Sequence, residues 1–315
     1  MGISGFALWL PLLVSAVVAL TAPAAGRRLP PRTAAWLLTT AAVIAAGAWV
    51  TVLAMIGFTL VGQIPEVAEE GRWSPHLLAA DTPVDRPVAA ACAMAVLVCA
   101  VTLTVVSWRQ ARLMVDAWRE CRDLPVAGDL VVVDDPVPTA FALPGLPGRV
   151  VVSSGMLRAL SADERRALLA HERAHLRHRH HVFLLVLQLT AAVNPLLRRV
   201  VGAGGFALER WADEEAGAVV ADRGLVARAV ARAALATRGA PAAAMAATGG
   251  PVPQRVRALL APPPPVRRRP ALAFAALLVA CCASLAVAGH DIDGLFDAAT
   301  TANTAGAAHC TVHPR

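Results

Sequence analysis

Two histidines and a glutamate in the segment His171-Glu172-Arg173-Ala174-His175 have the residue types and the spacing of half a catalytic zinc site. Four residues of α-helix advance by roughly 400° and about 6 Å, so His171 and His175 lie on one face and can bind one metal ion. Glu172 lies beside that face, where its carboxylate can accept a proton from water on the metal. The same pattern also arises by chance on surface helices of a chain rich in Ala, Arg and Glu, so it needs support from elsewhere.

Two further features support a metal site. Ser161 and Glu164, just before an apolar run, predict a capping box, which places the histidines about two turns into a helix. A second helical stretch carries Glu209 and Asp213 at the i, i+4 spacing of one helix face. A catalytic zinc ion takes three protein ligands and keeps one position open, so two histidines need a partner, and Glu209 is the natural candidate.

These motifs and their surroundings resemble those of the gluzincin membrane metallopeptidases. Glu209 lies 34 residues after His175 and opens a Glu-x-x-x-Asp motif. Residues 138–142 and 149–157 precede the histidines, and in such enzymes this region leads from a substrate-facing strand into the motif helix. Within the group, the sequence looks like the BlaR/MecR-type antirepressor peptidases, with the CAAX-prenyl endoproteases and heat-shock membrane proteases as the neighbouring family. The resemblance covers roughly residues 130–260.

The resemblance implies one zinc ion (Zn2+) per chain, with His171, His175 and Glu209 as its ligands and Glu172 as the general base. Asp213 would accept a hydrogen bond from a liganding imidazole and thereby orient it. Two alternatives stay open on the residues alone. Asp213 could be a solvated carboxylate on a helix surface, and another acid of the same stretch could be the third ligand.

The chemistry of this set is metal-assisted hydrolysis of a peptide bond. A strand edge near residues 139–142 could align a peptide by backbone hydrogen bonds through Thr139, Ala140 and Phe141, although a surface loop explains these residues equally well. A donor for the developing oxyanion is also expected, and tyrosine is excluded because the chain has none. The remaining candidates are His178, Arg210, Arg255 and Arg257.

Composition indicates an integral membrane protein. Hydrophobic residues make up 57% of the chain and charged residues 16%, against roughly a quarter charged in soluble proteins. Four apolar runs approach or exceed the ~20 residues that cross a bilayer, at residues 3–20, 33–62, 87–108 and 271–289. The first run could instead be a cleaved signal peptide, although no basic residue precedes it and it is longer than such segments usually are.

Arginines flank the runs unevenly and so predict the orientation. They follow the first and third runs and precede the fourth, whereas the segment after the second run is mainly acidic. By the positive-inside rule, we expect a multi-pass protein of the cell membrane with both termini outside and residues 109–269 cytoplasmic. The arginines concerned are Arg27, Arg28, Arg32, Arg109, Arg112, Arg119, Arg122, Arg267, Arg268 and Arg269.

A fifth apolar stretch, residues 182–193, is too short to cross the bilayer and ends at Asn194-Pro195. A crossing there would also separate Glu209 from His171. We therefore expect a buried or membrane-dipping continuation of the motif helix, with residues 196–208 returning beside it and the zinc near the membrane surface. Residues 177–181, which include His178, His180 and His181, are expected to face lipid headgroups.

The net charge of +7 raises the question of nucleic acid. The basic residues lie beside the apolar runs, where topology and anionic lipid explain them, and no basic stripe is interleaved with aromatic residues. The lipid bilayer is therefore an expected partner, and direct binding of nucleic acid is not expected. Three remaining features carry less information. The cysteines form no disulfide framework, and residues 261–265 predict a stiff linker. The tail around His309, Cys310 and His313 fits a disordered polar terminus better than a metal or redox sensor.

The predicted fold is mainly α: a polytopic membrane protein with about four transmembrane helices and a cytoplasmic α+β zincin-like peptidase domain. Three transmembrane helices occupy residues 1–107, the peptidase domain residues 108–265, the fourth transmembrane helix residues 266–289, and a short extracytoplasmic tail residues 290–315. Within the peptidase domain, the predicted strands are residues 130–133 and 150–153. The predicted helices are residues 162–193, 198–221 and 225–237.

The resemblance implies a cytoplasmic protein substrate, and a transcriptional repressor in a signalling pathway is the substrate it favours. The antirepressor sensors carry a large ligand-binding domain after the last span, and residues 290–315 are too few for one, so we expect a signal to arrive by another route. A housekeeping protease for membrane protein quality control is one alternative. A catalytically idle signal transducer with a structural zinc is another, although Glu172 argues against it because a closed structural site needs no base.

Overall fold

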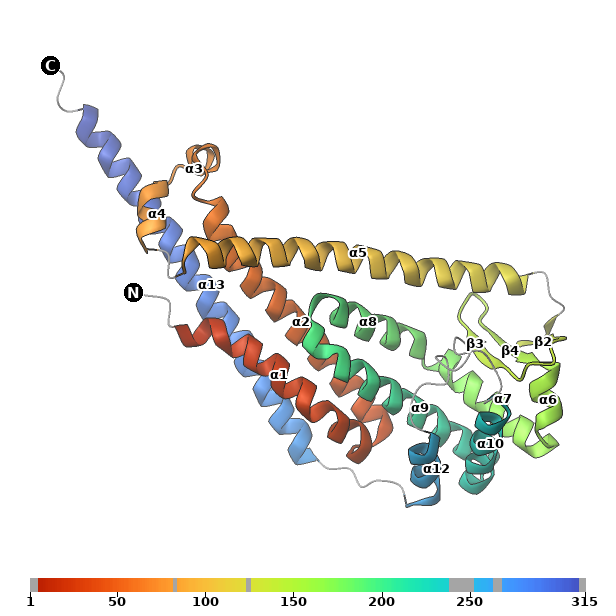
Figure 1. The fold of residues 1–315 in the computed structure, drawn as a ribbon. Coiled ribbons are helices and arrows are strands. Elements are labelled where there is room, and N and C mark those ends of the chain that lie inside the picture. Colours follow the sequence, from red (N-terminus) through yellow and green to blue (C-terminus); the bar gives the residue numbers. More distant parts are fainter. Residues whose placement is uncertain (1–4, 82–83, 123–125, 238–251, 263–267, 312–315) are drawn as a thin grey trace.

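The computed structural model describes residues 5–81, 84–122, 126–237, 252–262 and 268–311. Long helices form one end of the molecule, and a small sheet with shorter helices forms the other (Figure 1). The mainly helical prediction is confirmed. Part of the expected linker at residues 261–265, the expected domain boundary at 265/266 and His313 of the tail lie outside the described residues.

Four helices of the described chain are long and apolar enough to cross a membrane. Three of them extend further than the sequence indicated. The first continues past residue 20 and the third past residue 108. The fourth continues as far as Thr311, so the described part of the tail is helical and the expectation of a disordered tail was wrong there. The four are α1 (Gly5–Arg28), α2 (Pro31–Val61), α5 (Arg86–Arg122) and α13 (Arg268–Thr311).

Small side chains hold the long helices together. The largest buried cluster contains the face of α2 formed by Ala41, Ala42 and Ala45, packed against Val14 and Val18 of α1. Small residues allow helix backbones to approach closely, which is how helices associate in lipid without a hydrophobic driving force. Between α2 and α5 lie two short helices, α3 (Pro65–Gly71) and α4 (Pro75–Asp81).

The motif helix is shorter than predicted. We expected one helix over residues 162–193, but α7 (Ala162–Arg177) and α8 (His180–Val193) are separate. Arg179 between them adopts a left-handed conformation with φ of 51°, which ends the first helix and redirects the chain. A short 3-10 helix, η1 (Pro195–Leu197), then leads into α9 (Arg198–Val220).

Helices α8 and α9 form a hairpin whose tip lies among the long helices (Figure 1). Asn194 at the tip is fully buried and donates its side-chain amide to the Ser15 hydroxyl of α1, 3.0 Å away. On the other side, the Thr102 hydroxyl of α5 donates to the Ala192 carbonyl at 2.9 Å. The predicted return of the chain is thus confirmed, and it brings Glu209 back to the side of His171.

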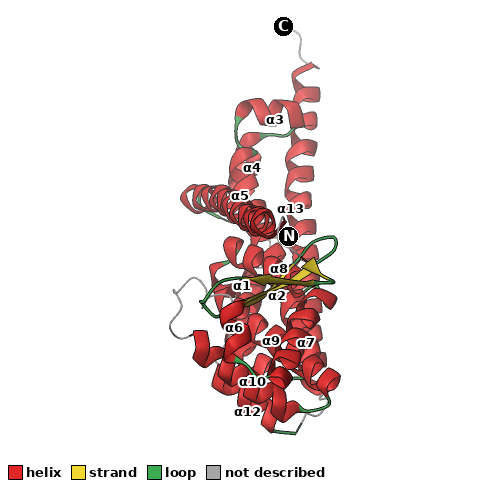
Figure 2. Cartoon of the chain, turned by 90° about the vertical axis from the view of Figure 1, so that its right-hand side faces the viewer, coloured by secondary structure: helices red, strands yellow, loops and turns green. Residues whose placement is uncertain are grey.

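A four-stranded sheet lies beside the motif helix, with strand order β1-β2-β4-β3. The middle strands β2 and β4 are parallel, and each edge strand is antiparallel to its neighbour. Figure 2 shows the sheet edge on, with α5 on one side and α6, α7 and α10 on the other. The bounds are β1 (Val126–Ala127), β2 (Leu130–Val133), β3 (Ala140–Leu143), β4 (Arg149–Ser153), α6 (Ser154–Ala159), α10 (Arg223–Ala236) and α12 (Val252–Leu260).

Candidate metal centre

The beginning of α7 is held by the predicted capping box. The Glu164 backbone N–H donates to the Ser161 hydroxyl at 3.4 Å, and the Ser161 N–H donates to the Glu164 carboxylate at 2.9 Å. Arg232 of α10 also donates to this carboxylate at 3.0 Å. The first turn of α7 is therefore fixed against α10. This also fixes the direction in which the face with His171 and His175 points, about two turns later.

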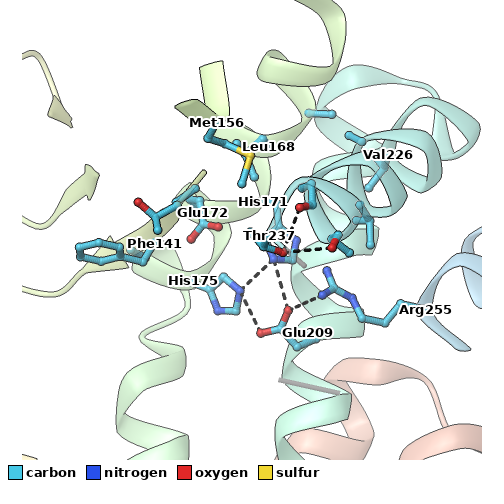
Figure 3. Close-up of a pocket in the computed structure, with 18 of the residues that line it drawn as sticks. Phe141, Met156, Leu168, His171, Glu172, His175, Glu209, Val226, Thr237 and Arg255 are labelled. Carbon is cyan, nitrogen blue, oxygen red and sulfur yellow. Dashed lines mark hydrogen bonds and ion pairs between the residues drawn. The ribbon is translucent and has the colours of Figure 1, made fainter. Parts of the chain in front are cut away.

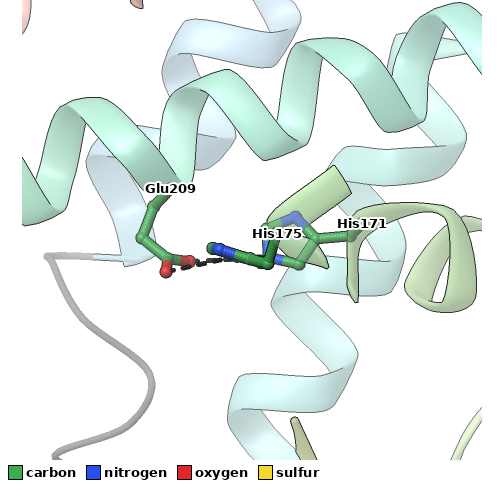
Figure 4. Close-up of side chains that lie close together, drawn as sticks. All are labelled: His171, His175 and Glu209. Carbon is green, nitrogen blue, oxygen red and sulfur yellow. Dashed lines mark hydrogen bonds and ion pairs between the residues drawn. The ribbon is translucent and has the colours of Figure 1, made fainter. Parts of the chain in front are cut away.

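The side chains of His171, His175 and Glu209 converge on one point (Figure 4). The two histidine Nε2 atoms are 3.1 Å apart, and the Glu209 carboxylate oxygens lie 3.5 Å from Nε2 of His171 and 3.6 Å from Nε2 of His175. Ligands about 2.0–2.1 Å from a tetrahedral zinc ion are about 3.3 Å from each other. The two nitrogens and the two carboxylate oxygens, one near each imidazole, therefore have separations close to those of zinc ligands, and the N, N, O chemistry suits zinc.

Asp213 lies on the far side of His171. Its carboxylate is 3.0 Å from Nδ1 of His171, the ring nitrogen that faces away from Glu209. A carboxylate at this position fixes which nitrogen of the imidazole carries the proton and raises the basicity of the other. The Asp213 side chain is buried rather than solvated on a surface, and its distance from Nδ1 is compatible with the expected orienting role.

The other acids of this stretch of α9 point elsewhere. The Glu214 carboxylate accepts from Arg223 at 2.7 Å, and the Glu215 carboxylate lies 3.2 Å from Nε2 of His178. Neither lines the cavity beside the histidines. Among these acids the structure therefore places only Glu209 within reach of both imidazoles.

Arg255 of α12 joins the two buried carboxylates. Its guanidinium donates two hydrogen bonds to Asp213, at 2.8 and 2.6 Å. It also lies 2.8 Å from Glu209, as Figure 3 shows. Burial alone would raise the pKa of both acids, but the adjacent guanidinium lowers the pKa of Glu209 to about 2 and that of Asp213 further. Both acids are therefore ionised at neutral pH, as a metal ligand and a hydrogen-bond acceptor must be.

The two histidines have opposite electrostatic surroundings. Burial lowers the pKa of both, but the carboxylates of Asp213 and Glu209 overcome this at His171 and raise its pKa to about 10. At His175 burial prevails and its pKa is lowered to about 4. Without a metal, the His171 imidazole is therefore protonated at both nitrogens, with Asp213 beside Nδ1 and Glu209 beside Nε2. A cation bound at Nε2 would replace the proton there.

Glu172 lines the cavity without joining the metal-binding group. Burial raises the pKa of its carboxyl, while the backbone N–H of Ala142 on β3 donates a hydrogen bond to it. A buried carboxylate of raised pKa beside the two histidines suits a group that accepts and returns a proton. Figure 3 shows Glu172 and Phe141 on the side of the cavity formed by the sheet.

The cavity has a volume of about 490 Å³ and runs past the histidines from β3 to α10. Its sheet side is formed by residues 138–142, which include Thr139, Ala140 and Phe141. Its opposite wall is apolar, with Val226, Val230 and Ala233 of α10. The cavity is large enough for a few residues of a peptide.

Of the two alternatives for residues 139–142, the structure has the strand, β3, and among the described residues β3 pairs with β4 alone. The Ser153 N–H donates to the Thr139 carbonyl at 2.9 Å, so Thr139 faces β4. Backbone groups alternate along an antiparallel strand, and therefore those of Ala140 and Ala142 face away from β4. The hydrogen bond from Ala142 to Glu172 shows that this open edge faces the active side chains.

Three of the four proposed oxyanion donors lie away from the cavity. Arg210 donates to the carbonyls of Gly26, Arg27 and Leu29 and so fixes the end of α1. His178 contacts Glu215 and stacks on Trp211, and Arg257 is exposed. Arg255 lines the cavity, but its described contacts are with the two carboxylates.

His180 has a position that the sequence did not indicate. It is fully buried, with Nδ1 2.9 Å from Nδ1 of His175, and its ring packs against Trp211. His181 lines the cavity. The expectation that these two histidines face headgroups was therefore wrong. Five residues separate His175 from His180, which places them on different faces of a continuous helix, and only the break at Arg179 brings them together.

Comparisons with known proteins agree with this geometry over part of the chain. Residues 108–207 match the profile of peptidase family M48. A stretch of 84 residues is 39% identical to "Protease HtpX homolog" of Aeropyrum pernix, which covers 24% of this chain and 26% of that protein. The chain thus spans about a quarter of the length of the curated relative that it matches. No solved structure matches the chain.

The M48 match includes the two histidines and Glu172, and it ends two residues before Glu209. The match supports a metallopeptidase of the M48 type. From the sequence we expected the antirepressor peptidases first, with the heat-shock membrane proteases as the neighbouring family, and the match does not support the antirepressor subtype. Together with the long apolar helices, it supports a membrane metallopeptidase.

Proposed function

We propose that this chain is a membrane-embedded zinc-dependent endopeptidase that hydrolyses a cytoplasmic protein. The observation that supports it most is the separation of 3.1–3.6 Å among the two Nε2 atoms and the Glu209 carboxylate, beside a cavity that contains Glu172. A structural zinc site has four protein ligands and no cavity. Three ligands beside an open cavity favour catalysis over a structural metal.

In this proposal His171, His175 and Glu209 hold the ion, and Asp213 keeps His171 in the tautomer that binds through Nε2. A zinc ion bound there supplies a Lewis acid for water and for the scissile carbonyl. Glu172 accepts the proton of the attacking water and delivers it to the leaving amine. Arg255 keeps both carboxylates ionised and fixed in place.

The substrate peptide would extend along β3. The backbone N–H and C=O groups of Ala140 face away from β4 and can form hydrogen bonds with an extended peptide. Thr139 and Phe141 lie on either side of Ala140. A peptide held in this way passes its carbonyl between the histidines and Glu172. The apolar wall of α10 would receive an adjacent apolar side chain of the substrate.

The membrane arrangement belongs to the proposal as well. We infer that the four long helices cross the cell membrane, that both termini lie outside, and that residues 108–265 form the peptidase domain on the cytoplasmic side. The arginines beside the apolar runs support this orientation.

The test is cleavage by the purified full-length protein, loaded with zinc, of an unfolded protein such as β-casein. We expect one zinc ion per chain and internal cleavage products. The substitution Glu172→Gln should keep the ion and abolish cleavage, whereas Glu215→Gln, a matched change outside the cavity, should leave cleavage intact. Absence of stoichiometric zinc, or full activity of Glu172→Gln, would rule out the proposal.

A transcriptional repressor is the substrate that the antirepressor resemblance favours, and quality control of damaged proteins fits the comparisons equally well. The two differ in selectivity. A regulatory enzyme should cut a winged-helix repressor encoded beside it at one site and much faster than casein, whereas a quality-control enzyme should degrade casein at many sites and at least as fast. Signalling that survives Glu172→Gln would instead favour an idle transducer.

A further inference from the structure

Two adjacent arginines, Arg198 and Arg199, lie at the tip of the hairpin formed by α8 and α9. Both are exposed. Among the described residues neither has a hydrogen-bond or ion-pair partner, in contrast to Arg210 on the same helix. The contacts of the tip show how deep in the bilayer this charged pair would lie.

Contacts with two apolar helices indicate the depth of the tip. Thr102, which bonds the Ala192 carbonyl, lies seven residues before Arg109, or about 10 Å along α5, and 16 residues after Arg86, or about 24 Å. Residues 87–108 between these arginines carry no charge.

The contact with α1 gives a similar depth. Ser15, which bonds Asn194, lies 12 residues before Arg27, or about 18 Å along α1. The hydrocarbon core is about 30 Å thick. If α1 and α5 cross the membrane as proposed, the tip at Asn194 therefore lies inside the hydrocarbon. Arg198 and Arg199 lie between this tip and Ala203, which packs against Gly26 near the inner end of α1, so the pair is about 6–8 Å deeper than that end.

The N-terminus of α9 is its deep end in the proposed membrane arrangement. Because side chains on a helix tilt toward its N-terminus, Arg198 and Arg199 are expected to tilt away from the inner headgroups. Basic residues in a first turn also oppose the helix dipole, so the pair does not stabilise α9. Exposed arginines at this depth are costly and mark functional sites when they occur.

We propose that Arg198 and Arg199 form a docking site for a transmembrane helix of another protein, which presents an Asp or Glu side chain within the bilayer. A guanidinium at this depth needs an anion that is also at this depth, and headgroup phosphates lie outside the hydrocarbon. A second copy of this chain does not provide one, because residues 1–62, 87–115 and 266–290 contain neither Asp nor Glu.

The surface beside the arginines suits a helix. Gly202 lies one turn after Arg198 on the exposed face of α9, and a Cβ added there would meet nothing within 4 Å. A small residue next to a polar one lets a second helix approach closely enough for a buried ion pair. Leu196, which is 44% exposed, continues this surface with an apolar contact.

The test uses the full chain in phosphatidylcholine vesicles and a synthetic transmembrane peptide of leucine and alanine with one central Asp. Energy transfer between a donor on the protein and an acceptor on the peptide reports association. We expect the Asp peptide to bind about tenfold more tightly than matched peptides with Asn or Leu. This preference should disappear in Arg198→Gln/Arg199→Gln and persist in Arg109→Gln/Arg112→Gln, which removes equal charge at the end of the apolar run of α5.

A second variant tests the surface without changing its charge. Gly202→Leu fills open space and contacts no described part of the chain, so it should leave the fold and the zinc content unchanged while it weakens binding of the Asp peptide. Equal binding of all three peptides, or equal loss in both arginine double variants, would overturn the proposal. So would displacement of the Asp peptide by 30% phosphatidylglycerol, because the arginines would then bind lipid phosphate.

The depth itself is measured independently. A fluorophore on Leu196→Cys, in a chain without other cysteines, should be quenched more strongly by nitroxide at carbon 12 of the acyl chain than by nitroxide on the headgroup. The opposite order would place the tip at the interface and remove the basis of the proposal. Zinc content and peptidase activity are separate readouts, so failure here leaves the proposed catalytic function untouched.

Discussion

His175 and His180 face each other through their Nδ1 atoms, 2.9 Å apart, across the break between α7 and α8. For His175 to bind a metal through Nε2, its Nδ1 must carry the proton and donate to an unprotonated Nδ1 of His180. Burial lowers the pKa of His180 to about 3, so His180 is neutral and can accept. His180 thus orients one imidazole as Asp213 orients the other.

We therefore predict that His180→Phe weakens zinc affinity by about 10–100-fold, the usual effect of losing a partner of a liganding histidine. His180→Asn, which retains an acceptor, should recover part of the loss. Competition with a zinc-binding dye measures the affinity, and His178→Gln serves as the matched control because His178 contacts Glu215 instead. Unchanged affinity in His180→Phe would show that His175 needs no acceptor.

Removal of Arg255 should destabilise the fold. The variant Arg255→Met leaves the ionised carboxylates of Asp213 and Glu209 buried and uncompensated, and the loss of one partner of a buried pair costs about 3–5 kcal/mol. Unfolding by denaturant in detergent measures this change. Addition of Asp213→Asn to Arg255→Met should recover part of the stability, because one uncompensated charge is then removed. If Arg255→Met alone were as stable as wild type, the proposed role of the guanidinium would be contradicted.

Chelation should also lower stability. An ion that binds only the folded chain stabilises it by RT ln(1 + [L]/Kd), or about 2.7 kcal/mol at one hundred times Kd. We expect a lower melting temperature with EDTA and recovery with added zinc. The variant His171→Ala lacks one of the proposed ligands and should show neither effect. A melting temperature that responds to EDTA equally in wild type and His171→Ala would point to a different ion site.

The capping box predicts one pH dependence away from the metal centre. Burial acts to raise the pKa of Glu164, but hydrogen bonds from Ser161 and the charge of Arg232 prevail and lower it. Because the folded pKa lies below the unfolded value, the contribution of Glu164 is complete above about pH 4.5 and is lost as the pH falls through the folded pKa.

The corresponding variant is Glu164→Gln. It should cost about 1 kcal/mol at pH 7, since the Arg232 side chain is 58% exposed and screened by water. The cost should diminish toward pH 3, as seen in denaturant unfolding at several pH values. Asp163→Asn, in the same turn but exposed with its partner Arg166, should show little change. A cost independent of pH would mean that the charge of Glu164 contributes nothing.

The sequence determined the parts of this protein that depend on neighbours a few residues apart. The capping box at Ser161 and the common face of His171 and His175 follow from helix geometry alone. The apolar helices follow from length and composition, because a long run of apolar residues has few alternatives to a buried or membrane-spanning helix. Glu209 was proposed through the need for a third ligand, and the hairpin then brought it within reach.

Contacts between distant segments decided the rest. Arg255 lies on a short helix 42 residues after Asp213, and nothing in the local pattern links the two. The sequence made Arg210 and Arg255 equal candidates for a donor in the cavity, but the Arg210 side chain binds the end of α1 instead. The left-handed residue Arg179 turned His180 from a surface position into a partner of His175. Such placements depend on which helices pack together. Packing results from many contacts between residues far apart in the chain, and the spacing of neighbouring residues does not reveal these contacts.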